Sequence, residues 1–248
     1  MYVLLGGIKP LVDEVMGRKA TRIYMGECNW HCPYCYVPEV LDKAQCQRVN
    51  LSETIYLLQQ MKGMDAVEIT GGEPTKQGKE LEALCRACKA EGWLVKVHTN
   101  GSNPGVVGDL VTENLVDVLS IDVKAPLNDK KMYAFVTGNK ADPQKVRESL
   151  GLAHLRSFKG FFEALIPVLP GVNDKVDVIS KICKDISYCD SLVLRGFDPR
   201  HDLVSEEWKD TDAPSHDTLL KLAKAGRDAL YNVDMVVIES VEKGKEII

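Results

Sequence analysis

The segment Glu27-Cys28-Asn29-Trp30-His31-Cys32-Pro33-Tyr34-Cys35 carries three cysteines in the spacing C-x3-C-x2-C. This spacing presents three thiolates to one soft metal centre from a single short loop. A structural zinc site uses four ligands, and an iron–sulfur cluster bound only by cysteines also uses four. The next cysteine, Cys46, lies eleven residues further on. We therefore expect a cluster held by three cysteines, with one iron left open. A zinc knuckle, or a chance grouping of cysteines, is the alternative.

The composition is that of a soluble globular protein: 248 residues, 45% hydrophobic and 27% charged, with a net charge of −5. No apolar run reaches the ~18 residues needed to span a bilayer, and residues 1–10 lack the basic region of a signal peptide. Eight cysteines without an export signal favour a reducing compartment, so a cytoplasmic protein with no membrane partner is expected. The negative net charge argues against nucleic acid as a partner.

Apolar patterning predicts alternating strands and helices. Strands are expected over residues 20–27, 66–70, 94–98, 117–124, 161–169 and 191–197, with a further candidate at 233–239. Helices are expected over residues 51–62, 76–90, 143–155, 176–186 and 215–230, the first with Ser52 as its cap. Such repeated units indicate a parallel α/β sheet. We expect one domain over residues 1–248, with a core of about 18–200 and a helix-and-strand extension of about 201–248.

The unusual residues follow the expected strands, where parallel α/β folds gather their functional groups. After the second strand come Thr70-Gly71-Gly72-Glu73-Pro74-Thr75, and after the third His98-Thr99-Asn100-Gly101. The fourth strand ends in Asp122-Val123-Lys124, and the fifth is followed by Pro170-Gly171-Val172-Asn173-Asp174. The sixth strand ends in the segment that starts with Arg195-Gly196-Phe197-Asp198. The paired glycines allow the backbone to approach a ligand closely, although Gly-Gly-Glu-Pro alone is also a common turn. These strand ends predict a single site on one rim.

The cysteine spacing, with Tyr34 before the third cysteine, closely resembles the signature of the radical S-adenosylmethionine superfamily, and Gly71-Gly72-Glu73-Pro74 resembles its second motif. The resemblance implies a partial (β/α)6 barrel in which Cys28, Cys32 and Cys35 hold a [4Fe-4S] cluster. The fourth iron then chelates S-adenosylmethionine, and an electron from the cluster cleaves it to methionine and a 5′-deoxyadenosyl radical. The resemblance and the strand-end positions together nominate these cofactor-binding residues: Tyr34, Gly71, Gly72, Glu73, Pro74, Asn100, Asp122, Lys124 and Arg195.

Several further segments resemble the activating proteins of glycyl radical enzymes, especially those of anaerobic ribonucleotide reductases. These segments are Gly6-Gly7-Ile8-Lys9-Pro10-Leu11, Asp122-Val123-Lys124-Ala125-Pro126, Tyr133 to Gly138, and Pro170 to Asp174. The resemblance implies a glycyl radical enzyme as protein substrate and a reductant such as flavodoxin or ferredoxin. The alternative is a radical enzyme that modifies a small metabolite, a nucleoside or RNA.

Two departures from the activases weaken the assignment of the substrate. Residues 163–169 lack an arginine that activases often carry there to reach the cofactor carboxylate, and Arg195 is the candidate replacement. Tyr36 follows the third cysteine where many activases have His-Asn.

The remaining cysteines, Cys46, Cys85, Cys88, Cys183 and Cys189, lack the dense spacing of an additional cluster. Free cysteine is among the most buried residue types, so packing in the core is the expected role. A second cluster is the alternative.

Overall fold

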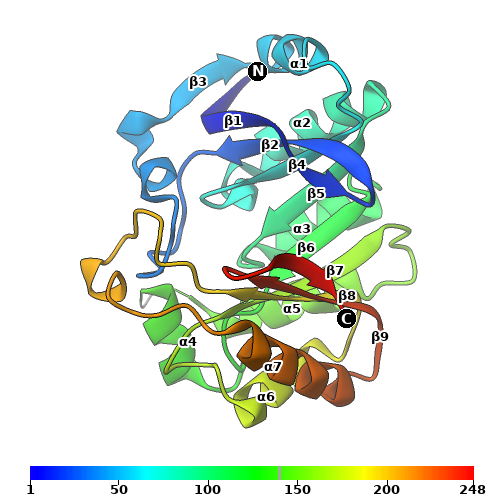
Figure 1. Cartoon of the computed structure of the whole chain (residues 1–248). Coiled ribbons are helices and arrows are strands. Elements are labelled where there is room, and N and C mark those ends of the chain that lie inside the picture. Colours follow the sequence, from blue (N-terminus) through cyan, green and yellow to red (C-terminus); the bar gives the residue numbers. More distant parts are fainter. Residues whose placement is uncertain (139–140) are drawn as a thin grey trace.

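The computed structural model describes residues 1–138 and 141–248. Its centre is one ten-stranded sheet in the order β10-β9-β8-β7-β6-β5-β4-β2-β1-β3 (Figure 1). The parallel part comprises β2 (Arg18–Met25), β4 (Ala66–Gly71), β5 (Leu94–Thr99), β6 (Val118–Asp122), β7 (Phe161–Val168), β8 (Tyr188–Gly196) and β9 (Asn232–Ser240). These strands lie in chain order, so each crossover leads to the neighbouring strand.

The two edges of the sheet are antiparallel and remain apart. β1 (Tyr2–Val15) pairs with β2 and with β3 (Gln47–Asn50), while β10 (Gly244–Ile247) pairs with β9. Figure 1 shows the strands curving around an open interior between these edges. The predicted partial barrel is therefore confirmed: the sheet is mostly parallel and does not close.

The helices cover the outer side of the sheet. They are α1 (Leu51–Gln59), α2 (Gly78–Ala90), α3 (Pro104–Thr112), α4 (Lys130–Thr137), α5 (Pro143–Ala153), α6 (Val176–Ile186) and α7 (His216–Ala229). In α6, the buried residues Val178, Ile179, Ile182, Cys183 and Ile186 recur at helical spacing, which places them on one face toward the sheet. Within the described ranges no helix is long and apolar enough to cross a membrane.

The expected strands and helices are present, with differences in detail. The candidate strand at 233–239 is β9, and the helix expected at 51–62 ends at Gln59. Asn50, and not Ser52, caps this helix: the Asn50 side chain accepts a hydrogen bond from the Ser52 amide at 3.0 Å. The sequence did not indicate β1, β3, β10, α3 or α4.

The inner face of the sheet carries a row of charged side chains. Arg22 and Glu68 are register partners on β2 and β4, and Glu68 is the partner of Lys96 on β5. Arg22 Nε lies 2.6 Å from Glu68 Oε2, and Lys96 Nζ lies 2.8 Å from Glu163 Oε1 on β7. The Ser120 hydroxyl donates to Glu163 at 2.8 Å. Neighbouring strands thus neutralise one another's charges below the rim that carries the motifs.

Candidate functional site

The cysteine loop leaves the carboxyl end of β2 and is fixed by backbone hydrogen bonds. The Glu27 amide donates to the Val40 carbonyl at 2.7 Å, and the Cys35 amide donates to Cys32 at 3.0 Å. The His31 amide donates to the Thr137 carbonyl at the end of α4 (3.2 Å). These contacts hold the loop at both ends and in its middle, so the three cysteines occupy defined positions.

The three thiols are free and partly buried. Burial raises the pKa of Cys28 to about 12 and that of Cys32 to about 11, and it also raises the pKa of Cys35. Because thiolates are the metal ligands, binding of iron has to displace protons from this loop.

The side chains of the cysteine loop are not arranged to bind a single metal ion. Among the described residues, no group of three or more His, Cys, Asp or Glu side chains is placed to hold one metal ion. An iron–sulfur cluster makes a different demand, because each thiolate binds a separate iron. Three free thiols on one loop fit such a cluster, and this donor arrangement disfavours the zinc knuckle.

Gly71 and Gly72 pack directly against the cysteine loop. A Cβ on Gly71 would lie 2.2 Å from the Met25 carbonyl oxygen, and a Cβ on Gly72 would lie 2.0 Å from that of Glu27. Gly71 also has a φ of 131°, a region that favours glycine. The Gly72 and Glu73 amides donate to these same two carbonyls, at 3.0 and 2.8 Å. The glycines therefore let the end of β4 lie against the backbone that leads into the cysteines.

Glu73 is fully buried and joins two strand ends. Its Oε1 accepts from the Thr75 amide (3.0 Å), the Thr75 hydroxyl (2.6 Å) and the Thr99 hydroxyl (2.6 Å). Its Oε2 accepts from the Asn100 amide at 2.7 Å. Burial raises the pKa of Glu73, although these hydrogen bonds oppose the effect. Since both oxygens are engaged by the chain, the side chain braces β4 against β5.

Asp122 is the centre of a second, largely buried cluster. Its carboxylate lies 2.5 Å from Lys124 Nζ and 2.6 Å from His98 Nε2. Burial acts to raise the pKa of Asp122, but Lys124 and His98 outweigh it and hold that pKa well below its usual range. Burial likewise acts to lower the pKa of Lys124, and Asp122 reverses the effect. Both groups are therefore charged.

Aromatic rings connect this pair to the cysteine loop. Lys124 Nζ lies 5.9 Å from the ring centre of Trp30 and 5.8 Å from that of Tyr34. The Tyr34 hydroxyl is buried without a hydrogen-bond partner among the described residues. An unpaired buried hydroxyl is a cost to the folded chain unless a ligand satisfies it.

One pocket brings these groups together. It is lined by Cys28, Cys32, Cys35, Tyr34, Gly71, Gly72, Glu73, Asn100, Asp122, Lys124 and Arg195, all predicted from the sequence. Pro74 is buried beside it and is not part of the lining. His98 and Thr70 also line the pocket, and their position at strand ends was the signal for them.

The pocket opens sideways. Its own space is about 130 Å³, and a neighbouring cavity of about 770 Å³ shares Tyr34, Tyr36, Val37, Pro167 and Arg195 with it. Arg195 is already ion-paired with Glu239 of β9, which is its register partner. Its guanidinium therefore reaches the pocket with part of its hydrogen-bonding capacity in use.

The remaining cysteines lie away from this pocket. Cys85, Cys88, Cys183 and Cys189 are fully buried in the core between sheet and helices. Burial raises the pKa of each of these thiols. Packing accounts for these four. Cys46 was also expected in the core, but it is only partly buried, with its thiol 3.4 Å from the Asp42 carbonyl beside the cysteine loop.

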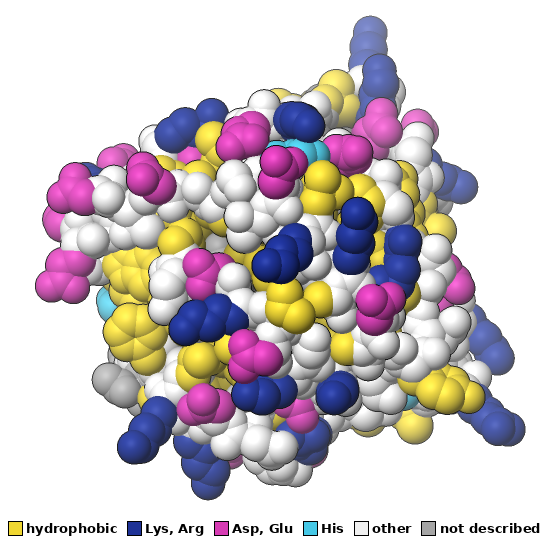
Figure 2. Space-filling model, turned by 60° about the horizontal axis from the view of Figure 1, so that its bottom comes forward, with side chains coloured by type: hydrophobic (Ala, Val, Ile, Leu, Met, Phe, Trp, Pro, Cys, Tyr) yellow, Lys and Arg dark blue, Asp and Glu magenta, His cyan; other side chains and the backbone are white. Residues whose placement is uncertain are grey.

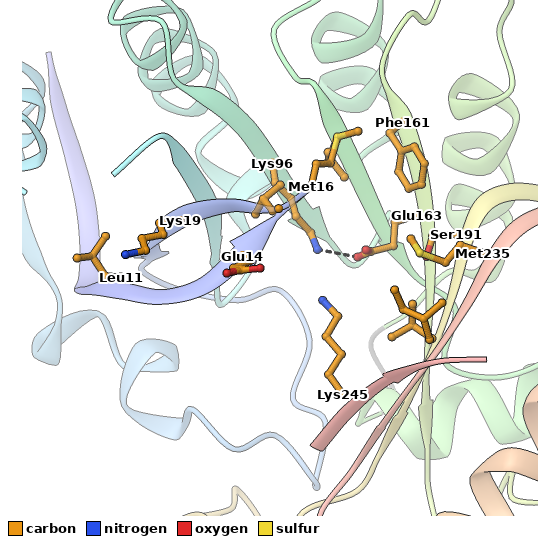
Figure 3. Close-up of a pocket in the computed structure, with 15 residues that line it drawn as sticks. Leu11, Glu14, Met16, Lys19, Lys96, Phe161, Glu163, Ser191, Met235 and Lys245 are labelled. Atoms are coloured by element: carbon orange, nitrogen blue, oxygen red, sulfur yellow. Dashed lines mark ion pairs between the residues drawn. The ribbon is translucent and has the colours of Figure 1, made fainter. Parts of the chain in front are cut away.

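A larger cavity, of about 980 Å³, lies at the opposite ends of the strands. Figure 3 shows Lys245 of β10 pointing toward the Lys96–Glu163 ion pair at its inner wall. The rest of the lining is mainly apolar, with Phe161 and Met235 among it, and none of the lining residues is a cysteine. The three thiols and this larger cavity therefore lie at different ends of the sheet.

Comparisons with known proteins show the family of the chain. Residues 23–181 match the family model described as the Radical SAM superfamily. Over its full length the chain is 30% identical to the whole of a Methanocaldococcus jannaschii protein provisionally named a glycyl-radical enzyme activating enzyme. It is 34% identical to the 7-carboxy-7-deazaguanine synthase of Aquifex aeolicus, over 36% of this chain and 39% of that enzyme.

A solved structure shows the same fold. TYW1 with a lysine-pyruvate adduct bound superimposes with a TM-score of 0.63 at 18% identity, covering 92% of this chain and 78% of the other. The family uses a [4Fe-4S] cluster and S-adenosylmethionine, and the thiols and polar strand ends described above fit both. Because the family match covers well over half of the chain and includes the cysteine loop, the protein belongs to the radical SAM superfamily.

Proposed function

We propose that this radical SAM enzyme installs a glycyl radical on a partner enzyme, such as an anaerobic ribonucleotide reductase. The full-length similarity to the provisionally named activating enzyme of M. jannaschii supports the proposal. So do the segments that resemble activases on both sides of the cysteine loop.

Cys28, Cys32 and Cys35 are the proposed ligands of the cluster. When bound, the cluster and S-adenosylmethionine supply a one-electron cleavage of a carbon–sulfur bond. The chain's contribution is to hold the thiols in place through the backbone contacts of Glu27 and His31. Trp30 and Tyr34 cover the loop and limit access of water, because both are buried.

Asp122 and Lys124 are the proposed contacts for the methionyl part of the cofactor. An amino acid carries an ammonium and a carboxylate, and this pair offers one charge of each sign at 2.5 Å separation. The backbone of Gly71 and Gly72 and the side chains of Tyr34, Asn100 and Arg195 complete the binding surface, and Glu73 and Pro74 fix its shape.

The sideways opening supports a protein substrate. The 770 Å³ cavity lies between β2 on one side and β8 and β9 on the other, where the sheet does not close. A polypeptide segment from a partner can enter an open seam of this kind beside Arg195 and reach the pocket. Hydrogen abstraction from a backbone glycine requires such access.

A small-molecule substrate is the second candidate. The observation in its favour is the 34% identity to a 7-carboxy-7-deazaguanine synthase across a third of the chain. A cavity of this size also admits a heterocycle.

Electron paramagnetic resonance distinguishes the two candidates. The reconstituted, reduced protein is mixed with S-adenosylmethionine and a co-occurring glycyl radical enzyme, and a doublet from a glycyl radical is expected. The matched control is the same partner with its radical glycine changed to alanine, which should give no doublet. A silent spectrum with every co-occurring partner, together with turnover of a small molecule, would contradict the proposal.

A further inference from the structure

The cysteine loop is covered from two sides by different parts of the chain. On one side, the segment 197–212 donates from the Val204 amide to Cys35 (3.1 Å) and from the Ser205 amide to Pro33 (2.9 Å). On the other side lies α4: the Thr137 carbonyl accepts from His31, and the Tyr133 ring meets Trp30 edge-on at 6.1 Å. The third approach to the loop, the seam beside Arg195, is the one proposed for the substrate, so we expect an electron carrier at one of these two covers.

The two covers differ in charge. The first cover, the segment 197–212, contains six carboxylates and two cationic side chains, a net charge of −4 with His201 neutral. The other cover adjoins a shallow cavity of about 720 Å³ between α4 and α6, which we call the α4–α6 patch. Its charged lining residues are Lys130, Lys131, Lys181, Lys184, Asp129 and Asp185, a net charge of +2.

Both aspartates of the patch are engaged by the chain itself. Asp129 caps α4 by accepting from the Met132 amide at 3.0 Å. Asp185 pairs with Arg147 at 3.0 Å and accepts from the Leu127 amide at 2.7 Å. The four lysines are exposed, and Lys181 lies 3.2 Å from Asp177. Lys130, Lys131 and Lys184 thus present most of the outward positive charge of the patch, on a chain whose total charge is −5.

The exposed face of α4 continues from the patch toward the cysteine loop. Phe135 lies one turn beyond Lys131 on the same face and is 56% exposed. Figure 2 shows lysine and arginine side chains interspersed with hydrophobic ones on the face that is turned toward the bottom of Figure 1. An eight-residue helix is about 12 Å long, so a protein seated on this face lies within one helix length of His31.

We propose that the α4–α6 patch is the docking surface for an acidic one-electron carrier protein that reduces the cluster. One electron passes from the carrier to the cluster, the carrier is oxidised by one electron, and no bond or proton is transferred. Charge complementarity selects this face, because an acidic carrier is repelled by the net −4 cover and attracted by the lysines. Electron-transfer contacts are small and depend on such steering.

The inference rests on the cluster that the family uses, and not on the glycyl-radical substrate. The seam beside Arg195 remains free for the substrate while a carrier occupies the opposite cover. Reduction and substrate binding can therefore proceed on separate surfaces.

The test compares two double variants with the same change of charge. K130E/K131E reverses the patch, while K221E/K224E reverses two exposed lysines on α7 as the matched control. Binding of reduced flavodoxin, taken as the acidic carrier, to the iron-free protein is measured by titration at low salt. Reduction of the reconstituted cluster by the same flavodoxin, and by dithionite, is followed by stopped flow.

We expect K130E/K131E to weaken flavodoxin binding and slow flavodoxin-driven reduction by roughly tenfold or more, the size of an electrostatic steering effect. The defect should shrink at high salt because the charges are screened. Dithionite should reduce both variants at the wild-type rate, and K221E/K224E should behave as wild type with flavodoxin.

Equal binding and equal flavodoxin-driven reduction in K130E/K131E and the wild type would overturn the proposal. Failure of the glycyl-radical function is a separate result, since no step of this test contains that partner.

Discussion

The two ends of the parallel strands use polar residues in opposite ways. At the amino-terminal half of the interior, Arg22, Glu68, Lys96 and Glu163 form a row of ion pairs with separations of 2.6 to 3.6 Å. At the carboxyl-terminal rim, beside the Asp122–Lys124 pair, three free thiols face a shared pocket together with the Tyr34 hydroxyl, which has no hydrogen-bond partner among the described residues.

This difference separates residues that serve the fold from residues available to a ligand. We call the ion pairs of Arg22, Glu68, Lys96 and Glu163 the lower row; its two cations balance its two carboxylates. The large cavity beside it has a mainly apolar lining (Figure 3). The rim pocket holds three free thiols and the unpartnered Tyr34 hydroxyl in a much smaller space. The chemistry of the lining, and not the volume of the cavity, locates the site.

Removing a thiol from the rim should have the largest effect. Cys32→Ala leaves two ligands on the loop, so we expect complete loss of the cluster and of 5′-deoxyadenosine release. Iron content and the visible absorption of the reconstituted protein measure this. Cys46→Ala, outside the pocket, is the control and should retain about four irons. Normal iron content in Cys32→Ala would remove the basis for the assignment of the loop.

Breaking the lower row should cost stability and leave the rim intact. Lys96→Met removes the cation between Glu68 and Glu163, both nearly buried, and the loss of one partner of a buried pair costs about 3–5 kcal/mol. Urea unfolding of the iron-free protein measures the loss. Lys181→Met breaks an exposed pair with Asp177 and should cost less than about 1 kcal/mol. Equal effects of the two substitutions would show that the lower row has no special role.

Lys124→Met should weaken the cofactor site, and because it leaves Asp122 with His98 alone, it should also cost stability of the same order as Lys96→Met. A charge-assisted hydrogen bond is worth about 1.5–3 kcal/mol, so affinity for S-adenosylmethionine should fall roughly tenfold to a hundredfold. Equilibrium binding to the reconstituted protein provides the measurement, with Lys96→Met as the comparison that should bind within about twofold of wild type. If Lys96→Met lost more affinity than Lys124→Met, the division between rim and lower row would be wrong.

The smallest expected effect is a loss of folding stability at acid pH, when Glu68 of the lower row becomes protonated. Burial acts to raise the pKa of Glu68, but Lys96 and Arg22 outweigh it and lower that pKa from 4.5 to about 2. A lowered pKa gives stability that is complete above about pH 4.5 and is lost as the pH falls toward 2. Unfolding free energies between pH 6 and 3 should therefore decline, and Glu68→Gln should flatten the decline. An unchanged slope in Glu68→Gln would assign the acid sensitivity to other groups.

The rim was predictable from the sequence because each of its motifs is local. The three cysteines, the two glycines and the pair Asp122 and Lys124 each lie within a few residues of one another, directly after an apolar strand. The order of the parallel strands then brings them to one edge.

Other elements were not predictable because their signals are weak or long-range. β1 contains Gly6, Gly7 and Pro10 and is interrupted by register shifts, so it lacks a regular alternation. α3 begins at Pro104 and carries two glycines, which lowers its helix propensity.

The lower row depends on register between strands far apart in the chain. A charged residue stands inside three of the expected strands, at Glu68, Lys96 and Glu163, and its alternating sign was the available signal. His216 shows the same limit: its position at the start of α7 does not indicate burial, yet it is buried, and its Nδ1 lies 3.2 Å from the Ser240 hydroxyl.

Anaerobic reconstitution with iron and sulfide, followed by reduction and addition of S-adenosylmethionine, tests the central claim most directly. The account predicts about four irons per chain, a single [4Fe-4S] signal lost in Cys32→Ala, and release of 5′-deoxyadenosine and methionine. Tightly bound zinc in place of iron, with no 5′-deoxyadenosine released, would contradict it.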